Sequence, residues 1–396
     1  MGNPPVLSGL DIITTEKPNE FRGRRIATIA NHTAVTSDLT LIYDVLAQGR
    51  GFEFVFLYSP FHGVRGDHQD SEEGQHIDKK TGRPVYPAAL LRGKDRAKEI
   101  EEHRVDTIVF DLQSAGSKYF GFKNVLSSAM EVAARTGVEV VVLDRPNPLG
   151  GLKTEGEVES VYRPRIGWYQ IPNVHGMTYG ELASMFNEEQ GISCELTVMR
   201  MSGWRRRMWY DDTGMFWPVV SCNLPTLESC LAFAGTCLFE GTNVSEGRGT
   251  TRPFEIIGAP WLGAEELSRV MNGIGLPGVK FGQAHFIPTS NPIRRFSKFA
   301  GQKCQGVRLY ITDRKAFQPV RTAVHLLAEI MSADPEEFAW LETEGHEVRY
   351  YMDWLAGSEQ LRTKLEQGVP PGDIIDSWTD MLDKYNERRR KYLLYD

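Results

Sequence analysis

The feature that most constrains the fold is a series of apolar segments that do not alternate with polar residues. Residues 25–30, 52–58, 107–110 and 138–143 are short, nearly continuous apolar runs separated by helical patterns. Such a run indicates a strand that is buried on both faces, as in a parallel sheet covered by helices above and below. We therefore predict a doubly wound, mostly parallel α/β domain in the first part of the chain.

Helical spacing of apolar residues occurs between these runs, at 40–48, 94–103 and 125–135, and the last helix is expected to stop at Gly137. Thr178 and Glu181 have the spacing of a capping box that opens a helix, so Glu181 is expected first to be a helix-start residue. The second half predicts a strand and two helices, which suit a smaller α+β domain, at 307–312, 320–331 and 378–392.

Length and composition limit the classes of function. A chain of 396 residues is longer than single cores usually grow, so two domains are expected. The net charge of −7 argues against nucleic acid as a partner. Five cysteines without a CxxC pair favour reduced thiols, and no apolar run approaches the ~20 residues of a membrane span. With no signal-peptide pattern at the N-terminus, we expect a cytoplasmic protein without a membrane partner.

Polar residues follow the last apolar residue of each predicted strand. They are Asn31-His32, Ser59 to Arg65, Asp111 with Gln113, and Asp144 to Asn147. The carboxyl ends of parallel strands meet at one edge of a sheet, where ligands bind in open α/β domains. These residues either form a pocket there or are polar only because loops are polar. No Gly-x-Gly-x-x-Gly follows the first strand and no phosphate-binding loop occurs, so a nucleotide cofactor is not expected.

Two further segments stand out as candidate loops of a site. His175 lies beside Gly176, just before the capping box, and has either a functional role or a structural hydrogen bond. Residues 239–251 combine Gly, Thr, Ser and Asn with one Arg and two Glu. This composition suits a backbone that approaches a polar ligand closely, and the alternative is an elaborate turn.

Taken together, these motifs are similar in order and spacing to those of the NamZ-type exo-β-N-acetylmuramidases. The matching segments are HGVRG (62–66), DLQSAG (111–116), VVLDRPNPLGG (141–151), EG (155–156), IPNVHGMTYGELA (171–183), CNLP (222–225) and FEGTNVSEGRGTTRPFEIIGAPW (239–261). The resemblance implies a Rossmann-like catalytic domain, which we place at 1–225, and an auxiliary domain at 226–396. It also implies release of N-acetylmuramic acid from peptidoglycan fragments in a cleft between the domains, without a metal or cofactor.

The chain departs from the family pattern in the loops of the expected site. The family's Pro-Glu-His-Gly, whose Glu is the leading candidate for the catalytic acid, is here Pro60-Phe61-His62-Gly63. The acid of its Gln-Asp pair is replaced by Ser114, and the segments 118–122 and 220–223 also differ. Phe cannot donate a proton, and general acid catalysis contributes typically ~10² to 10⁴ in rate. An unchanged mechanism therefore requires another acid.

Two side chains are proposed as replacement acids, His62 and Glu157, and two as the second carboxylate, Asp111 and Glu246. Glu155 and His175 are further acids within the matching segments. Five residues are expected to orient the substrate: Arg65, Asn147, His175, Asn243 and Arg248. Cys222 is a thiol in a pocket motif that is either a nucleophile or, as the favoured reading, a buried small side chain.

Three functions fit these residues. The first is a glycosidase that acts on N-acetylmuramic acid or a related amino sugar with a rearranged acid. The second is a family member recruited to a different reaction in a specialised biosynthetic pathway. The third is a protein that binds a sugar or metabolite without catalysis. A hydrolase requires an acid that reaches the pocket around Phe61 and Ser114, whereas a binding protein does not.

Overall fold

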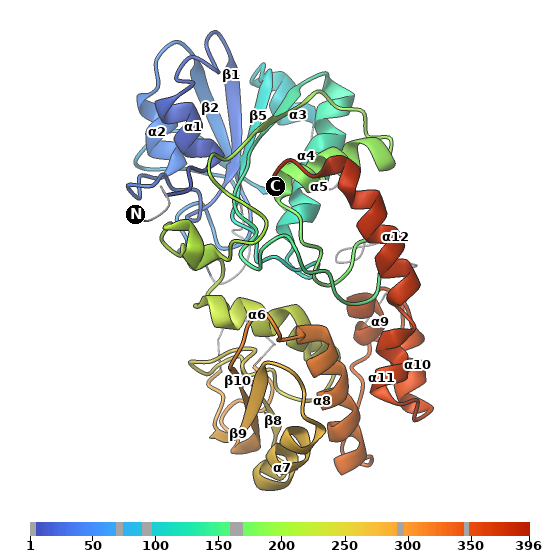
Figure 1. Cartoon of the computed structure of the whole chain (residues 1–396). Coiled ribbons are helices and arrows are strands. Elements are labelled where there is room, and N and C mark those ends of the chain that lie inside the picture. Colours follow the sequence, from blue (N-terminus) through green and yellow to red (C-terminus); the bar gives the residue numbers. More distant parts are fainter. Residues whose placement is uncertain (1–4, 69–73, 89–96, 159–168, 291–296, 344–347) are drawn as a thin grey trace.

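The chain folds around two sheets, one in each half of the molecule (Figure 1). The structure is a computed structural model, and it describes residues 5–68, 74–88, 97–158, 169–290, 297–343 and 348–396. The first domain contains the larger sheet and the second contains the smaller one, as expected for an α/β domain followed by a smaller α+β domain. The boundary predicted between residues 225 and 226 lies directly before Thr226, the N-cap of helix α6.

The first sheet has seven strands in the order β3-β4-β2-β1-β5-β6-β7. Only β3 runs antiparallel to its neighbour, and the other pairs are parallel. The strands are β1 (Arg25–Ala30), β2 (Glu53–Ser59), β3 (His76–Ile77), β4 (Pro84–Pro87), β5 (Thr107–Asp111), β6 (Glu139–Leu143) and β7 (Leu196–Met199). All five residues of β5 and of β6 are buried, which agrees with the absence of alternation in the sequence.

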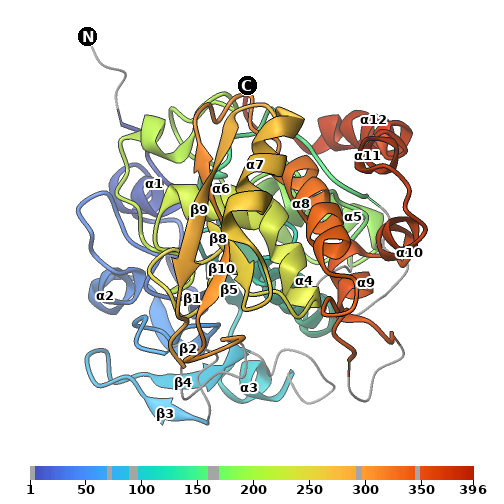
Figure 2. The ribbon, with the colours of Figure 1, turned by 90° about the horizontal axis from the view of Figure 1, so that it is seen from below.

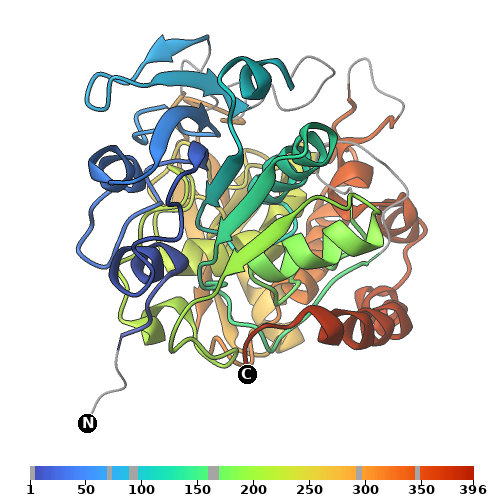
Figure 3. The ribbon, with the colours of Figure 1, turned by 90° about the horizontal axis from the view of Figure 1, so that it is seen from above.

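Helices cover both faces of this sheet (Figure 3). They are α1 (Gly9–Thr15), α2 (Ile42–Gln48), α3 (Ala97–Glu102), α4 (Phe122–Thr136) and α5 (Tyr179–Glu189). One core cluster joins α1 and α2 to Ile26 and Val109, and the other joins α4 and α5 to Ala27 and Ile108. Neighbouring residues of a strand therefore belong to opposite cores, as the pleat of a sheet requires. The doubly wound fold is confirmed.

The second domain has an antiparallel sheet in the order β8-β10-β9. Its strands are β8 (Ile256–Ala259), β9 (Val279–Phe286) and β10 (Cys304–Ile311). Its helices are α6 (Leu227–Thr236), α7 (Ala264–Ile274), α8 (Pro319–Ala333), α9 (Tyr351–Ala356), α10 (Gln360–Glu366), α11 (Pro371–Asp376) and α12 (Thr379–Arg389). Two short 3₁₀ helices, η4 (Cys237–Gly241) and η5 (Arg390–Tyr392), follow α6 and α12, and a third, η3 (Tyr210–Thr213), precedes this domain. Figure 2 shows α6, α7 and α8 around this sheet, with α10 to α12 at one side.

The end of the chain returns to the first domain. After α12 the last residues lie beside α5, far from the small sheet that precedes them in the sequence (Figure 1). There the Leu394 amide donates to Glu181, and the Tyr395 hydroxyl donates to Asp144. The larger core cluster also runs from α4 and α5 into α6 and α8, so the two domains share buried apolar surface.

The helices and strands expected from the sequence lie where they were predicted, within a few residues at each end. Gly137 ends α4 with a positive φ of 69°, and Thr178 and Glu181 form the predicted capping box of α5. The first three residues of the helix predicted at 94–103 lie outside the described residues. No helix within the described ranges is long and apolar enough to cross a membrane.

Candidate active site

The turn after β2 presents two aromatic side chains at the carboxyl edge of the sheet. His62 adopts a positive φ of 76°, and Gly63 follows with 73°. A non-glycine residue in this region is strained, and such strain is often found at functional sites. The backbone carbonyl of Phe61 accepts a hydrogen bond of 3.3 Å from the Asn31 side chain, and Phe61 is 38% exposed. The turn therefore holds Phe61 outward, while the imidazole of His62 is buried.

A cavity of about 560 Å³ begins at this turn and is lined by residues of both domains. Its walls are rich in aromatic rings. The first domain contributes Phe61, Phe120 and Phe122, and the second contributes Phe233, Phe254 and Trp354. The phenols of Tyr119 and Tyr351 also line it. Apolar, mostly aromatic walls with a few polar groups are typical of sites for small organic ligands.

The second domain contributes an ion pair between Glu240 and Arg248 to the cavity lining. Glu240 lies in η4, and both side chains are about 15% exposed and line the cavity. Arg248 stands between Gly247 and Gly249, which have positive φ values and leave no room for a Cβ beside neighbouring backbone oxygens. Burial opposes the charge of Arg248, but Glu240 and Glu246 outweigh it and raise the pKa of the guanidinium.

Glu246 lies behind this pair and does not line the cavity. Its carboxylate contacts Arg248 at 3.2 Å and the Lys298 ammonium at 2.8 Å. Lys298 also donates to the backbone carbonyls of Phe239 and Val244, so it holds both ends of the segment that carries Glu240. Arg248, predicted to orient the substrate, lines the cavity, whereas Glu246, predicted as a catalytic carboxylate, does not.

Asp111 lies at the end of β5 but is enclosed by the protein. Arg145 binds both of its oxygens and also donates to the backbone carbonyl of Val35 at 2.9 Å. Burial raises the pKa of Asp111, although Arg145 acts in the opposite direction. The loops after β1, β5 and β6 are in contact with one another, since the Gln113 amide donates to the Thr33 hydroxyl and its side chain donates to the carbonyl of Pro146. Asp111 is not among the residues that line the cavity.

Arg65 forms salt bridges with two carboxylates and is not among the residues that line the cavity. Its guanidinium binds Asp78 with two hydrogen bonds, of 3.0 and 2.9 Å, and lies 3.7 Å from Asp44. Burial opposes ionisation of Asp78, but Arg65 and Thr81 outweigh it and lower the pKa of this carboxyl to about 2. These contacts fasten the loop that follows the turn.

Glu155 and Glu157 lie where the two domains meet. Glu157 accepts a hydrogen bond from Ser358, and the adjacent Lys118 ammonium donates to the carbonyl of Ala356 at 2.7 Å. Burial lowers the pKa of Lys118 to about 8. Glu155 accepts a hydrogen bond of 2.7 Å from the Arg321 amide in the first turn of α8. Both carboxylates therefore join the domains rather than line the cavity.

Three predicted substrate-orienting residues bind backbone instead. The ring of His175 accepts from the Met177 amide at 3.1 Å, and burial with the nearby Lys123 and Arg389 lowers its pKa to about 3. Asn147 donates to the carbonyl of Met177 at 2.9 Å. Asn243 donates to the carbonyl of Glu337 at 2.6 Å. Each of these side chains holds a loop in place.

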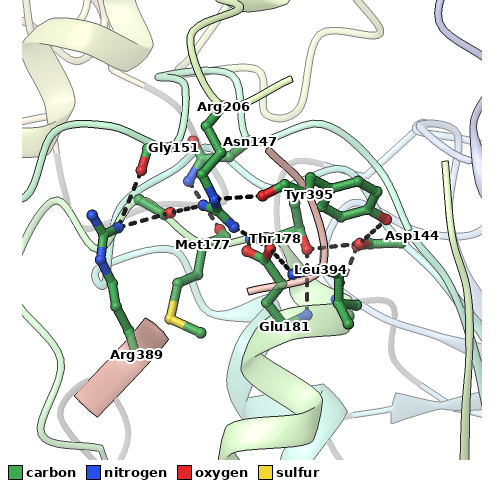
Figure 4. A network of polar contacts seen from close by, with 12 residues as sticks. Asp144, Asn147, Gly151, Met177, Thr178, Glu181, Arg206, Arg389, Leu394 and Tyr395 are labelled. Carbon is green, nitrogen blue, oxygen red and sulfur yellow. Dashed lines mark hydrogen bonds and ion pairs between the residues drawn. The ribbon is translucent and has the colours of Figure 1, made fainter. Parts of the chain in front are cut away.

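A second polar network binds the end of the chain to the first domain (Figure 4). Asp144 accepts hydrogen bonds from Thr178 at 2.6 Å and from Tyr395 at 2.7 Å, and burial raises its pKa to about 6. Glu181 pairs with Arg206 and accepts from the Leu394 amide at 2.8 Å. Glu181 is the capping residue predicted from the sequence, and it has this additional role.

The sequence did not single out Glu240 or Tyr351. Glu240 is the second residue of the matching segment 239–261, but the sequence alone gives no reason to prefer it to Glu246 as a catalytic acid. Cys222 is exposed rather than buried, so the favoured reading of this thiol is wrong, and its neighbours Ser221 and Asn223 line the cavity. Among the described residues, no group of His, Cys, Asp and Glu side chains is arranged to hold a metal ion.

Comparisons with known proteins identify relatives over nearly the whole chain. Residues 26–228 match the family described as exo-beta-N-acetylmuramidase NamZ, N-terminal, and residues 231–395 match its C-terminal counterpart. Peptidoglycan beta-N-acetylmuramidase NamZ of Bacillus subtilis (strain 168) is 42% identical over 395 residues, which cover 99% of this chain and 92% of the relative.

Two crystal structures of DUF1343 family proteins from Bacteroides fragilis NCTC 9343 have the same fold. One superposes with a TM-score of 0.87 at 31% sequence identity. The other has a TM-score of 0.78 at 26% identity. In each case the match covers 99% of both chains.

Proposed function

The chain belongs to the NamZ exo-β-N-acetylmuramidase family, and we propose that it is a glycosidase that removes N-acetylmuramic acid or a related amino sugar from peptidoglycan fragments. The observation that carries this proposal is the cavity at the turn after β2. It combines aromatic walls with His62 on one side and the Glu240–Arg248 pair on the other. Aromatic faces suit the apolar faces of sugar rings, and the polar groups suit the glycosidic bond.

Hydrolysis of a glycoside requires an acid for the leaving oxygen and a second group near the anomeric carbon. Of the four predicted catalytic residues, His62 lines the cavity, and we propose it as the proton donor. The contacts of Asp111, Glu157 and Glu246 favour supporting roles for these carboxylates. Among the five predicted substrate-orienting residues, Arg248 faces the cavity, and we propose that it contacts the sugar or the carboxylate beside it.

Phe61 supports an alternative function as well. It lines the cavity at the position where the family pattern has the presumed acid, and its ring lies 6.4 Å from that of Phe122. A site with two aromatic rings here binds a sugar ring whether or not the bond is cleaved. Recruitment to another reaction, or binding without catalysis, is therefore the second candidate.

The decisive experiment measures hydrolysis of a chromogenic N-acetyl-β-muramide by the wild type and by Phe61→Glu. We expect slow turnover by the wild type, with His62 as its donor, and a kcat higher by up to ~10²–10⁴ in the variant, because a carboxylic acid then stands at the position of the family's presumed acid. Phe216→Glu is the control, since Phe216 is exposed and does not line the cavity. Turnover by neither protein, with N-acetylmuramic acid still bound in calorimetry, favours the binding function. If neither turnover nor binding is detected, both candidate functions are contradicted.

The expected cytoplasmic location stays a prediction. All five cysteines are free thiols in the structure, and four of them are buried. Fractionation of the producing cells, followed by detection of the chain in each fraction, tests the location.

A further inference from the structure

We infer that Glu240 is the negatively charged catalytic carboxylate of this glycosidase, and that Arg248, Glu246 and Lys298 position it. The inference rests on the proposed function. Asp111, Glu157 and Glu246, the carboxylates predicted for catalysis, point into internal contacts. Among the described residues that line the cavity, Glu240 is the one that carries a carboxylate.

Glu240 is the carboxylate of the cavity lining, and its neighbours there are the Arg248 guanidinium, a phenol and a thiol. The hydroxyl of Tyr351 donates to one Glu240 oxygen at 3.4 Å, and Arg248 pairs with the other. Burial and then Glu240 raise the pKa of Tyr351 and of Cys237 well above their ordinary values, so the phenol and the thiol stay neutral. Burial likewise raises the pKa of Tyr119, which also lines the cavity, well above its ordinary value.

The charges of Glu240, Arg248, Glu246 and Lys298 balance one another. Arg248 contacts two carboxylates, and the second of these, Glu246, also contacts Lys298. Two cations and two carboxylates therefore form one chain, in which only Arg248 and Glu240 reach the cavity. A fixed anion beside a ligand stabilises the positive charge that develops on a sugar ring when its glycosidic bond breaks.

Backbone packing also holds Glu240 in place. A Cβ on the next residue, Gly241, would lie 2.7 Å from the Cα of Met352 in α9. The carbonyl of Gly241 accepts from the Leu341 amide at 2.9 Å. Helix α9 thus presses directly on η4, and the same helix begins with Tyr351, which binds the Glu240 carboxylate. Such rigid support is what a reacting side chain requires.

The test compares wild type, Glu240→Gln and Glu240→Ala on an activated aryl N-acetyl-β-muramide. We expect kcat to fall by ~10²-fold or more in both variants, as loss of one catalytic carboxylate predicts. Binding of N-acetylmuramic acid, followed by calorimetry, should persist in Glu240→Gln. Sodium azide should restore turnover in Glu240→Ala, because a small anion can occupy the space of the carboxylate. The anomeric form of the glycosyl azide then distinguishes a nucleophile from a base.

The positioning role of Glu246 has its own readout. Glu246→Gln should lower kcat more than it raises KM, because its carboxylate does not reach the sugar and acts through Arg248, which pairs with Glu240. The matched control is Glu255→Gln, a buried carboxylate that pairs with Arg252 and Arg308 outside the cavity lining. We expect this variant to keep wild-type kcat and KM.

The outcomes separate the two proposals. Turnover by the wild type with equal turnover by Glu240→Gln overturns the role of Glu240 alone. No turnover by the wild type on any aryl amino-sugar glycoside overturns the proposed function, and the role of Glu240 with it. A kcat loss in Glu240→Gln that is matched by Glu255→Gln also overturns the role, because it indicates general damage to the fold. A loss that azide does not relieve in Glu240→Ala overturns it as well, because the missing anion is then not what limits turnover.

Discussion

At the scale of single residues, the acids that the sequence offers differ mainly in what pairs with them. Asp111 has its charge compensated by Arg145 in a pair that is almost completely buried. Removing one member of such a pair typically costs 3–5 kcal/mol, so these residues are expected to be essential for folding whatever their part in catalysis. Glu155 differs, because one of its buried oxygens has no hydrogen-bond partner in the described structure. Burial raises its pKa to about 7.

The raised pKa of Glu155 predicts a pH dependence of stability. The folded state favours the protonated acid, so its stabilising effect is complete below the unfolded pKa of ~4.3 and is lost as pH rises through about 7. The wild type should therefore lose roughly 3 kcal/mol of unfolding free energy over this range relative to Glu155→Gln, at ~1.4 kcal/mol per pKa unit. Urea unfolding of both proteins at several pH values between 4.5 and 7.5 measures the difference. Parallel curves for the two proteins would contradict it.

At the scale of elements, local signals placed the helices and strands, and glycines set how closely they approach. Thr178 and Glu181 cap α5, and Gly137 ends α4, as their sequence patterns predict. The contact between α6 and α8 was not predictable, because it depends on Gly235 meeting a segment about 85 residues later. An ideal Cβ at Gly235 would lie 1.9 Å from the backbone oxygen of Pro319.

Gly235→Ala is therefore expected to destabilise the second domain. The added methyl group would force α6 away from α8, and overpacking of this kind typically costs 1–3 kcal/mol. Gly273→Ala in α7 is the matched control, since a Cβ there has no atom within 4 Å. That variant should gain up to ~1 kcal/mol from helix propensity. Thermal unfolding of both variants measures the effect, and equal melting temperatures would show that α6 and α8 can separate without cost.

At the scale of the whole molecule, the two domains are held together by three kinds of contact. The larger apolar core continues from the first domain into the second. Lys118 donates to the carbonyl of Ala356, the last residue of α9, and Glu157 accepts from Ser358, two residues later. The last three residues of the chain then bind Asp144, Glu181 and Arg206 of the first domain. Because the cavity is lined from both domains, these contacts fix the distance between its walls.

Tyr395→Phe tests the contribution of the chain end. Loss of the hydroxyl removes one donor from the buried Asp144, which should cost about 1–3 kcal/mol of unfolding free energy. Tyr310→Phe is the control, because Tyr310 is 46% exposed. Hydrogen exchange should also become faster at the end of β6 and the start of α5 in Tyr395→Phe. Unchanged exchange there would show that the end of the chain does not hold the first domain.

The sequence by itself determined the class of the fold, the approximate bounds of the central strands and of several helices, and the resemblance to the family. These properties depend on apolar periodicity, caps and short motifs, which act over a few neighbouring residues. It also identified the turn at His62 and the segment that carries Arg248.

Only the tertiary structure decided which acids face the cavity. Asp111 meets Arg145 across two strands, Glu157 meets Ser358 from the other domain, and Glu240 meets Tyr351 from a later helix. Each partner lies between 34 and 201 residues away in the chain. A carboxylate remains available for chemistry when its surroundings leave it open to a ligand, and those surroundings are set by packing of distant segments.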